Sequence, residues 1–251
     1  MTRIRFVSWN VHSCVGTDGR YDPRRIADVL RGLDADVIGL QEVDWRKPHL
    51  EGRDQFGYLA DSLAMTPVEG PNLEDHLGHY GNGLLTRLAI EQVTTIEIAQ
   101  PGREPRGLID AVVHTNAGHL RALVTHLGLS WKERRRQMRS IADHLAHSEP
   151  ESLPVVCMGD FNEWLPRRCS GVIRRTHACS LEAAPRSFPS SAPMFRLDRI
   201  LVSESPQYEA VQVRAPRRCR DASDHLPVCV DLLLNSQSED GASRPPQCCG
   251  S

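Results

Sequence analysis

The sequence lacks several features that would narrow its class. Basic residues are not in excess, since 30 lysines and arginines stand against 32 aspartates and glutamates, for a formal net charge of −2. This balance gives no global attraction to nucleic acid or to an acidic membrane. No apolar run approaches the roughly 18 residues of a membrane span, and the N-terminus lacks the apolar core of a signal peptide. We therefore expect a cytoplasmic protein.

The cysteines do not form a metal-binding pattern. There are eight, and none are spaced as C-x-x-C. Cys157 and Cys229 lie in apolar runs and are expected in the core. Cys248 and Cys249 lie in a Ser/Pro/Gly-rich tail, residues 235–251, which we expect to be disordered with exposed thiols. A lipidated or metal-binding tail is the alternative.

The first 40 residues combine strand-like and helical patterns. Residues 4–9 and 37–40 are apolar runs typical of buried strands. Between them, Asp22 precedes Pro23 as a helix cap would, and Gly32 marks the expected end of the helix. A strand–helix–strand unit of this length predicts a parallel or mixed sheet.

The rest of the chain repeats these patterns. Ser130 and Glu133 form an S-x-x-E capping box at the start of one predicted helix. Residues 44–77 are polar and are expected to be irregular apart from one short helix. The predicted helices are at residues 55–64, 130–147 and 166–175. The predicted strands are at residues 82–90, 92–98, 108–114, 119–127, 155–158, 195–202 and 228–234. This α/β alternation predicts two β-sheets packed face to face with helices outside. Since motifs occur from end to end, we expect one domain over residues 1–234.

The segment PVVCMGDFNEW shows the most specific pattern. Its apolar run predicts a buried strand that ends at Gly159. Asp160 and Asn162 follow at positions i and i+2, so an extended backbone would place both side chains on one side. A carboxylate beside a carboxamide suits a hard metal ion and an attacking water. A strand followed by a simple Asx turn is the alternative.

Polar residues also flank other apolar runs. Asn10 ends RIRFVSWN, Glu42 ends DVIGLQE, Asp198 lies in FRLDRILVS, and Asp224 and His225 open SDHLPVCVDLLL. The motifs WNVH, LQEVD, THL, GDFN, LDRILVS and SDHLPV occur in this order between residues 9 and 228. In this respect the chain resembles the endonuclease/exonuclease/phosphatase superfamily. The resemblance implies a four-layer α/β/β/α sandwich and metal-dependent hydrolysis of phosphoesters.

Phosphoester hydrolysis gives these residues expected roles. A metal cation neutralises the negative phosphate and a base activates water. Oxygen ligands fit Mg²⁺ or Mn²⁺. Glu42 is the best direct ligand, and Asn10 would hold the metal or the phosphate. Asp160 would position and deprotonate the water, and Asn162 would support the water and the pentacoordinate phosphorus.

Asp198 and His225 are expected to form an orienting pair in which the carboxylate favours the protonated imidazole. The roles of the aspartates and the histidine could also be reversed. Asp224 would bind a metal or brace its neighbour. The alternative for Asp198 is a salt bridge to Arg196 or Arg199.

Three further residues are candidates for substrate binding. The resemblance implies a phosphate-contacting histidine at His126. Arg106 offers a guanidinium fork for phosphate oxygens. Asn82 lies in HYGNG, where glycines allow close approach of the substrate. An ordinary surface arginine and a hairpin turn are the alternatives for the last two.

The choice of substrate class is limited mainly by motifs of known subgroups that this sequence lacks. LQEVD lacks the Thr-Lys that follows the glutamate in abasic-site nucleases, and neither the basic inositol-phosphatase motifs nor the apolar hairpin of secreted sphingomyelinases is present. The chain looks most like compact bacterial members, so we expect a monomeric phosphodiesterase. A DNA-directed nuclease, an inositol- or lipid-phosphate phosphatase, and a non-enzymatic phosphate-binding protein are alternatives. Local basic surfaces could form from arginines within residues 134–136, 167–168, 174–175 and 217–220.

Overall fold

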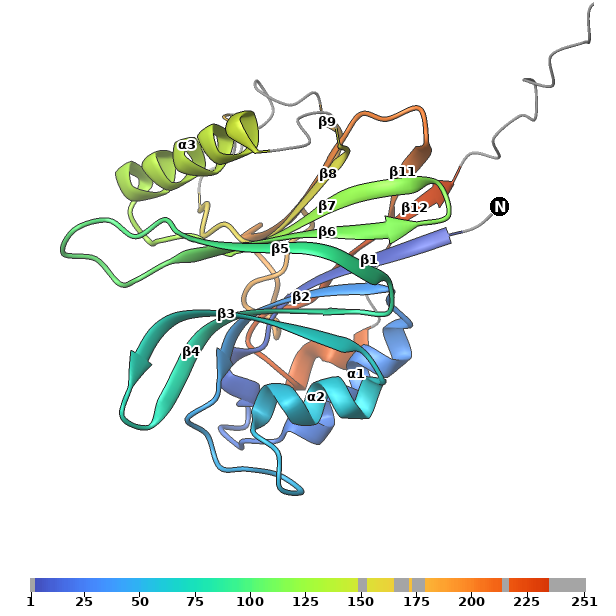
Figure 1. The fold of residues 1–251 in the computed structure, drawn as a ribbon. Helices are drawn as coiled ribbons and strands as arrows, with labels where there is room; N and C mark the ends of the chain where they lie inside the picture. The colour runs from blue at the N-terminus through green and yellow to red at the C-terminus, as the bar shows by residue number, and fades with distance from the viewer. Residues whose placement is uncertain (1–2, 149–152, 165–171, 173–178, 214–216, 235–251) are drawn as a thin grey trace, which may run out of the picture.

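The computed structural model describes residues 3–148, 153–164, 172, 179–213 and 217–234. Within these residues the chain forms two mixed six-stranded sheets that pack face to face (Figure 1). The first sheet has the spatial order β11 (Tyr208–Val213), β12 (Val228–Leu234), β1 (Arg3–Asn10), β2 (Val37–Asp44), β4 (Gly78–Thr86) and β3 (Thr66–Asp75). The second sheet has the order β5 (Ala89–Glu97), β6 (Gly107–Thr115), β7 (Gly118–His126), β8 (Val155–Asp160), β10 (Asp198–Ser203) and β9 (Cys179–Ala183).

Helices cover the outer face of each sheet. The helices α1 (Pro23–Leu33) and α2 (Gln55–Leu63) pack on the first sheet, and α3 (Trp131–His147) packs on the second (Figure 1). Two short 3-10 helices, His12–Cys14 and Arg217–Asp221, complete the described elements. The predicted four-layer α/β/β/α sandwich is confirmed.

Each sheet contains one parallel pair of strands. In the first sheet β1 pairs with β2, and α1 makes the connection. In the second sheet β7 pairs with β8, and α3 makes the connection. Because a helix crossover carries the chain back to the same end of the sheet, both strands of each pair finish at one edge. Four strands therefore end close together.

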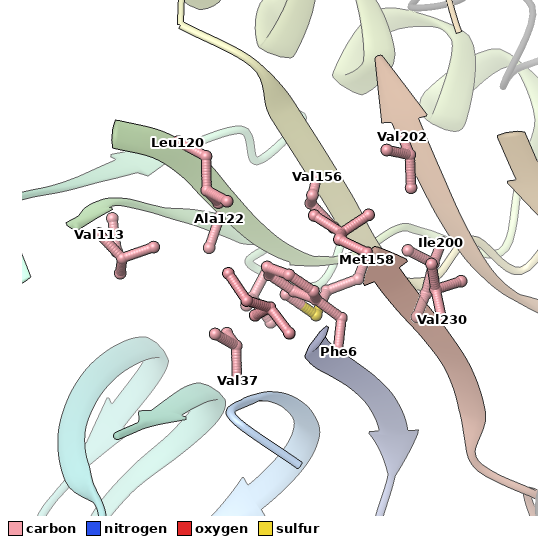
Figure 2. Packing of buried hydrophobic residues seen from close by; sticks show 14 of the residues in the cluster. Phe6, Val37, Val113, Leu120, Ala122, Val156, Met158, Ile200, Val202 and Val230 are labelled. Atoms are coloured by element: carbon pink, nitrogen blue, oxygen red, sulfur yellow. The ribbon is translucent and has the colours of Figure 1, made fainter. Parts of the chain in front are cut away.

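The main core lies between the two sheets. Phe6 and Val37 of the first sheet face Met158 and Ile200 of the second, and all four are buried (Figure 2). Gly39 in β2 has no side chain at a close approach of the two sheets, since a Cβ there would lie 2.9 Å from Met158 and Val124 atoms. A glycine in this strand therefore permits the observed spacing of the sheets.

Replacing Gly39 with alanine should lower the free energy of unfolding by about 1–3 kcal/mol, the usual cost of overpacking a core. Gly32→Ala is the matched control, because Gly32 lies in α1 and a Cβ there would meet nothing within 4 Å. This control should stabilise the protein by about 0.5–1 kcal/mol. Denaturant unfolding measures both changes. A Gly39→Ala protein as stable as the wild type would contradict the packing described here.

Several predicted elements end elsewhere than expected. The Asp22 side chain accepts a hydrogen bond from the Arg25 backbone at 3.2 Å, as a cap should. The helix passes Gly32, however, and ends at Leu33, with Asp34 in the left-handed conformation at φ 49°. Aspartate tolerates that conformation better than most residues, so a glycine was not required for the end.

The irregular structure expected for residues 66–75 is wrong, because this segment forms β3 and pairs with β4. The segment is polar, which was the ground for the expectation, and it also contains two prolines. Because β3 is an edge strand, prolines are tolerated there. The next two strands were also misplaced. The predicted break between them was at Glu91, but the observed break is at residues 87–88. There the chain passes from β4 in the first sheet to β5 in the second.

The capping box predicted for α3 does not form. The helix begins at Trp131 as expected, but Ser130 makes no side-chain hydrogen bond to it. Arg134 and Gln137 hold the preceding loop instead. Arg134 Nη1 donates to the Gly128 carbonyl at 3.2 Å, and Gln137 Oε1 accepts from the Gly128 amide at 2.9 Å. Two predictions, the helix at residues 166–175 and the disordered tail at 235–251, lie outside the described residues.

Candidate active site

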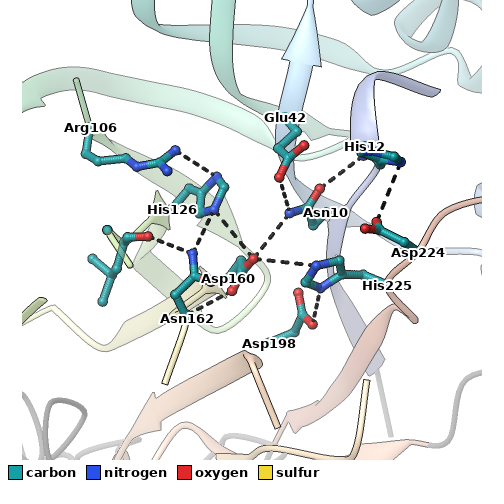
Figure 3. Close-up of polar contacts among 12 residues, drawn as sticks. Asn10, His12, Glu42, Arg106, His126, Asp160, Asn162, Asp198, Asp224 and His225 are labelled. Atoms are coloured by element: carbon teal, nitrogen blue, oxygen red, sulfur yellow. Dashed lines mark hydrogen bonds and ion pairs between the residues drawn. The ribbon is translucent and has the colours of Figure 1, made fainter. Parts of the chain in front are cut away.

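Four predicted residues meet where the crossover strands end. Asn10 ends β1, Glu42 lies near the end of β2, His126 ends β7 and Asp160 ends β8. Figure 3 shows their side chains directed toward one another across the gap between the two sheets. Residues at the carboxyl ends of adjacent strands line a crevice in open α/β sheets.

Two residues reach the same place from neighbouring antiparallel strands. Asp198 opens β10 and lies directly opposite Asp160 in the strand register. His225 precedes β12, and its carbonyl accepts a hydrogen bond from Trp9 Nε1 at 2.9 Å. Ligand atoms of Asp160, Asp198 and His225 all lie within 4.8 Å of one another. The predicted convergence therefore includes these three residues.

Asn10 joins two carboxylates that come from different sheets. Its Nδ2 donates to Glu42 Oε1 at 2.8 Å and to Asp160 Oδ2 at 3.2 Å (Figure 3). Its Oδ1 accepts from the His12 amide at 3.0 Å, and its carbonyl accepts from Ser223 Oγ at 2.8 Å. In this orientation the amide nitrogen of Asn10 faces both carboxylates and its amide oxygen faces the His12 backbone.

Asp198 and His225 form the expected pair. Asp198 Oδ2 lies 2.8 Å from His225 Nδ1, and both residues are buried. Burial alone would lower the pKa of His225, but Asp198, with Asp160 and Asp224, raises it to about 10. The imidazole is therefore protonated at neutral pH. The alternative salt bridge is not formed, because Arg199 instead pairs with Glu163 at 3.1 Å.

The Asp160 carboxylate is buried among these groups. Its Oδ2 lies 3.5 Å from His126 Nε2 and 3.8 Å from His225 Nε2. Burial and the Asp198 carboxylate raise the pKa of Asp160 to about 7, although His225 opposes this shift. A carboxyl group with such a pKa can accept a proton near neutral pH.

His126 lies between Arg106 and Asn162. Arg106 Nη1 lies 3.2 Å from His126 Nδ1, and Asn162 Nδ2 lies 3.1 Å from His126 Nε2. Burial, with the charges of Arg106 and His225, lowers the pKa of His126 well below its usual value. The ring is therefore neutral at neutral pH.

Asn162 enters the site through the Asx turn that was the alternative for this segment, not through an extended backbone. Its backbone is left-handed, with φ 48°, so residues 160–162 are not extended. The Asn162 amide instead donates to Asp160 Oδ1 at 2.8 Å, in an Asx-type turn. Its side-chain Nδ2 lies 3.1 Å from His126 Nε2 and donates to the Leu127 carbonyl at 2.9 Å. The turn after β8 therefore itself brings the Asn162 side chain next to His126.

The other predicted residues lie around this centre. Asn82 donates to the Gly107 carbonyl at 3.1 Å and so holds the backbone next to Arg106. Arg106 also pairs with Glu104 at 3.1 Å. Asp224 lies 3.8 Å from His12 and accepts from Ser223 Oγ at 3.3 Å. The structure thus places Asp224 beside His12 (Figure 3).

The sequence analysis did not identify a cluster of aromatic side chains that packs beside His225. The Phe188 ring lies 4.8 Å from the His225 ring, and the Trp164 ring packs at 5.8 Å on Phe188 and at 4.8 Å on Phe195. Phe188 and Phe195 lie in a loop without strand or helix periodicity, so no local pattern identified them. Tyr80 was missed too. Burial and Glu42 raise the pKa of Tyr80, so its hydroxyl keeps its proton.

The donor atoms fit a hard divalent cation. Glu42 and Asp160 supply carboxylate oxygens within reach of one Asn10 amide group. One oxygen of the buried Asp198 carboxylate has no hydrogen-bond partner among the described residues. A site with several carboxylates and an unmet negative charge suits Mg²⁺ or Mn²⁺ better than a metal that prefers thiolates.

Comparisons with known proteins agree with this fold. The family model described as Endonuclease/Exonuclease/phosphatase family matches residues 7–225. The uncharacterised protein YbhP of Escherichia coli K12 is 28% identical over 246 residues, which cover 92% of this chain and 96% of that protein.

Solved structures are similar over most of the chain. An endonuclease/exonuclease/phosphatase from Beutenbergia cavernae has a TM-score of 0.70 and 24% identity, with coverage of 93% of this chain and 72% of that one. The mannosyl-6-phosphatase Bt3783 of Bacteroides thetaiotaomicron has a TM-score of 0.72 and 17% identity, with coverage of 92% and 100%. At these identities the likeness concerns the fold.

Proposed function

Because the chain belongs to the endonuclease/exonuclease/phosphatase family, whose members hydrolyse phosphoesters, we propose that it is a divalent-metal-dependent phosphodiesterase. The observation that carries the proposal is the pair of carboxylates joined by Asn10, which faces the Asp198–His225 and Arg106–His126 pairs. Carboxylates that can hold a cation thus lie across the site from groups that can donate hydrogen bonds to a phosphate.

The charge of the site favours a diester over a monoester. The carboxylates of Glu42, Asp160 and Asp198, with Asp224 beside His225 and Glu104 on Arg106, outnumber the two cationic groups, His225 and Arg106. A bound divalent cation would offset part of this negative charge. A phosphodiester, with one negative charge, would be repelled less by the remainder than a phosphomonoester, which carries up to two at neutral pH.

Each residue has a definite task in this mechanism. When bound, the cation neutralises phosphate charge and makes a bound water more acidic, and Glu42 is the residue that would hold it. Asp160 orients the attacking water and accepts its proton. The protonated His225 donates to a phosphoryl oxygen, where negative charge grows in the transition state, and the neutral His126 lies beside the Asp160 carboxylate. Asp198 and Arg106 act through these two histidines.

A substrate and metal panel tests the proposal. The protein should hydrolyse bis-p-nitrophenyl phosphate faster than p-nitrophenyl phosphate, lose activity in EDTA and regain it with Mg²⁺ or Mn²⁺. Glu42→Gln should raise the metal concentration for half-maximal activity about tenfold or more, since it removes a ligand charge. Glu51→Gln is the control, because Glu51 pairs on the surface with Arg24, and it should change nothing. Full activity in EDTA would refute the metal dependence.

A further inference from the structure

Two large apolar side chains are exposed directly after the active site. Leu129 is 68% exposed and Trp131 is 47% exposed. They flank Ser130 at the start of α3, three and five residues after His126. Most side chains of this size are buried, so neighbouring exposed ones often mark an interaction site.

The exposed face of α3 continues this surface with positive charge. Lys132, Arg135, Arg136 and Arg139 are all exposed and recur at i, i+3, i+4 and i+7, which places them on one face. None of the four makes an ion pair with another described residue. Asp143 follows on the same face and ends the positive stretch. The first turns of α3 thus carry a local positive charge in a chain whose net charge is −2.

These cations differ from several exposed arginines elsewhere. Arg24, Arg31 and Arg53 are also exposed, yet each pairs with a nearby carboxylate at 2.6–2.7 Å. Other exposed arginines, such as Arg103 and Arg196, make no ion pair with a described residue either. On α3, however, four such cations share one helix face.

Arg134 is not part of this surface, although the sequence groups it with Arg135 and Arg136. It is buried, and its guanidinium donates to the carbonyls of Gly128 and Leu129. These contacts fix the loop that carries Leu129. Asn162 donates to the carbonyl of Leu127 in the same loop, so the exposed surface is continuous with the edge that holds the active site.

We propose that Leu129, Trp131, Lys132, Arg135, Arg136 and Arg139, here called the docking surface, bind the protein to an anionic phospholipid membrane. The cations lie over the lipid phosphates while Leu129 and Trp131 enter the boundary of the acyl region. Within the described residues no helix is long and apolar enough to span a membrane. Attachment is therefore peripheral and reversible.

A membrane fits this surface better than a nucleic acid does. Both partners attract cations, but sites for single-stranded nucleic acid add aromatic rings that stack on bases. Leu129 has no ring and gains free energy only in an apolar phase. Together with the proposed function, on which this step rests, docking at this edge makes the phosphodiester of a lipid headgroup the substrate class.

Vesicle binding tests the docking surface. Wild-type protein should co-sediment with vesicles of phosphatidylcholine and phosphatidylglycerol, but much less with phosphatidylcholine alone, and added salt should weaken binding. Replacing Lys132, Arg135, Arg136 and Arg139 with glutamine should lower the partition coefficient by about three orders of magnitude, about fivefold for each cation removed. Leu129→Ser with Trp131→Ser should lower it by about tenfold, with the salt dependence kept.

Matched controls separate docking from general charge and from catalysis. Arg24→Gln with Arg31→Gln and Arg53→Gln removes three exposed cations elsewhere, and Leu77→Ser removes an exposed leucine at another turn. Both control proteins should bind vesicles like the wild type. The docking variants should hydrolyse a water-soluble diester at the wild-type rate and lose activity only on phospholipid vesicles.

Three results would overturn the proposal: no binding to anionic vesicles, equal losses in the control and docking variants, or binding to DNA without binding to vesicles. The proposed function fails separately. If the wild type does not hydrolyse the soluble diester, the phosphodiesterase assignment is wrong, while vesicle binding still decides the docking surface.

Discussion

Asp160→Asn should lower turnover of a phosphodiester by about two orders of magnitude or more, the usual cost of losing a general base. The amide keeps the shape of the side chain and can still accept from the Asn162 backbone, which bonds Oδ1 at 2.8 Å. It cannot take a proton from water. Steady-state kinetics with a soluble diester measures the loss.

Stability provides an independent reading of the same variant. Burial and Asp198 disfavour the charged form of Asp160, so Asp160→Asn should unfold at the same denaturant concentration as the wild type or a higher one. Asp231→Asn is the control. Asp231 is also buried but pairs with Arg5 at 2.7 Å, away from the site. This control should lose stability and keep its turnover per folded molecule. Wild-type turnover in Asp160→Asn would exclude its role as the base.

Asp198→Asn and His225→Gln should each lower turnover by roughly two to three orders of magnitude, and the double variant should be no worse than the poorer single variant. The reason is that Asp198 acts on the phosphate through His225, at 2.8 Å. Residues that work as one unit give strongly non-additive losses. Additive losses would show that the two residues act separately.

The pH profile distinguishes positioning from a purely structural role. In the wild type the carboxylates raise the pKa of His225 to about 10, so the imidazolium is present through neutral pH and is lost only as the pH rises through that value. Without the Asp198 carboxylate, burial lowers the pKa of His225. Asp198→Asn should therefore lose its remaining activity at a lower pH than the wild type does. An unchanged alkaline limb would contradict this coupling.

Much of the site could be predicted because it is local in the sequence. Asn10, Glu42, His126 and Asp160 each lie at or near the end of an apolar run. A buried strand must end where its apolar run ends, and a parallel crossover brings such ends to one edge. The pattern of apolar runs therefore predicts both the strands and the edge at which the polar groups meet.

Other features depend on contacts between distant segments and have no local signal. The edge position of β3 made its prolines acceptable, and only the order of strands in the sheet decides which strand is at the edge. The loop before α3 is likewise held by the buried Arg134 in place of the predicted Ser130 cap. The sequence alone did not distinguish Arg134 from its exposed neighbours.

By itself, then, the sequence determined the residue types at the strand ends and where most of the buried strands lie, because hydrophobic periodicity is a local property. Only the tertiary structure decided the protonation of the histidines. Burial and the charge of Arg106 lower the pKa of His126 and keep it neutral, and Asp198, from the other sheet, raises the pKa of His225 and keeps it charged. Both effects come from partners brought close by folding in a buried place, where neighbouring charges act strongly.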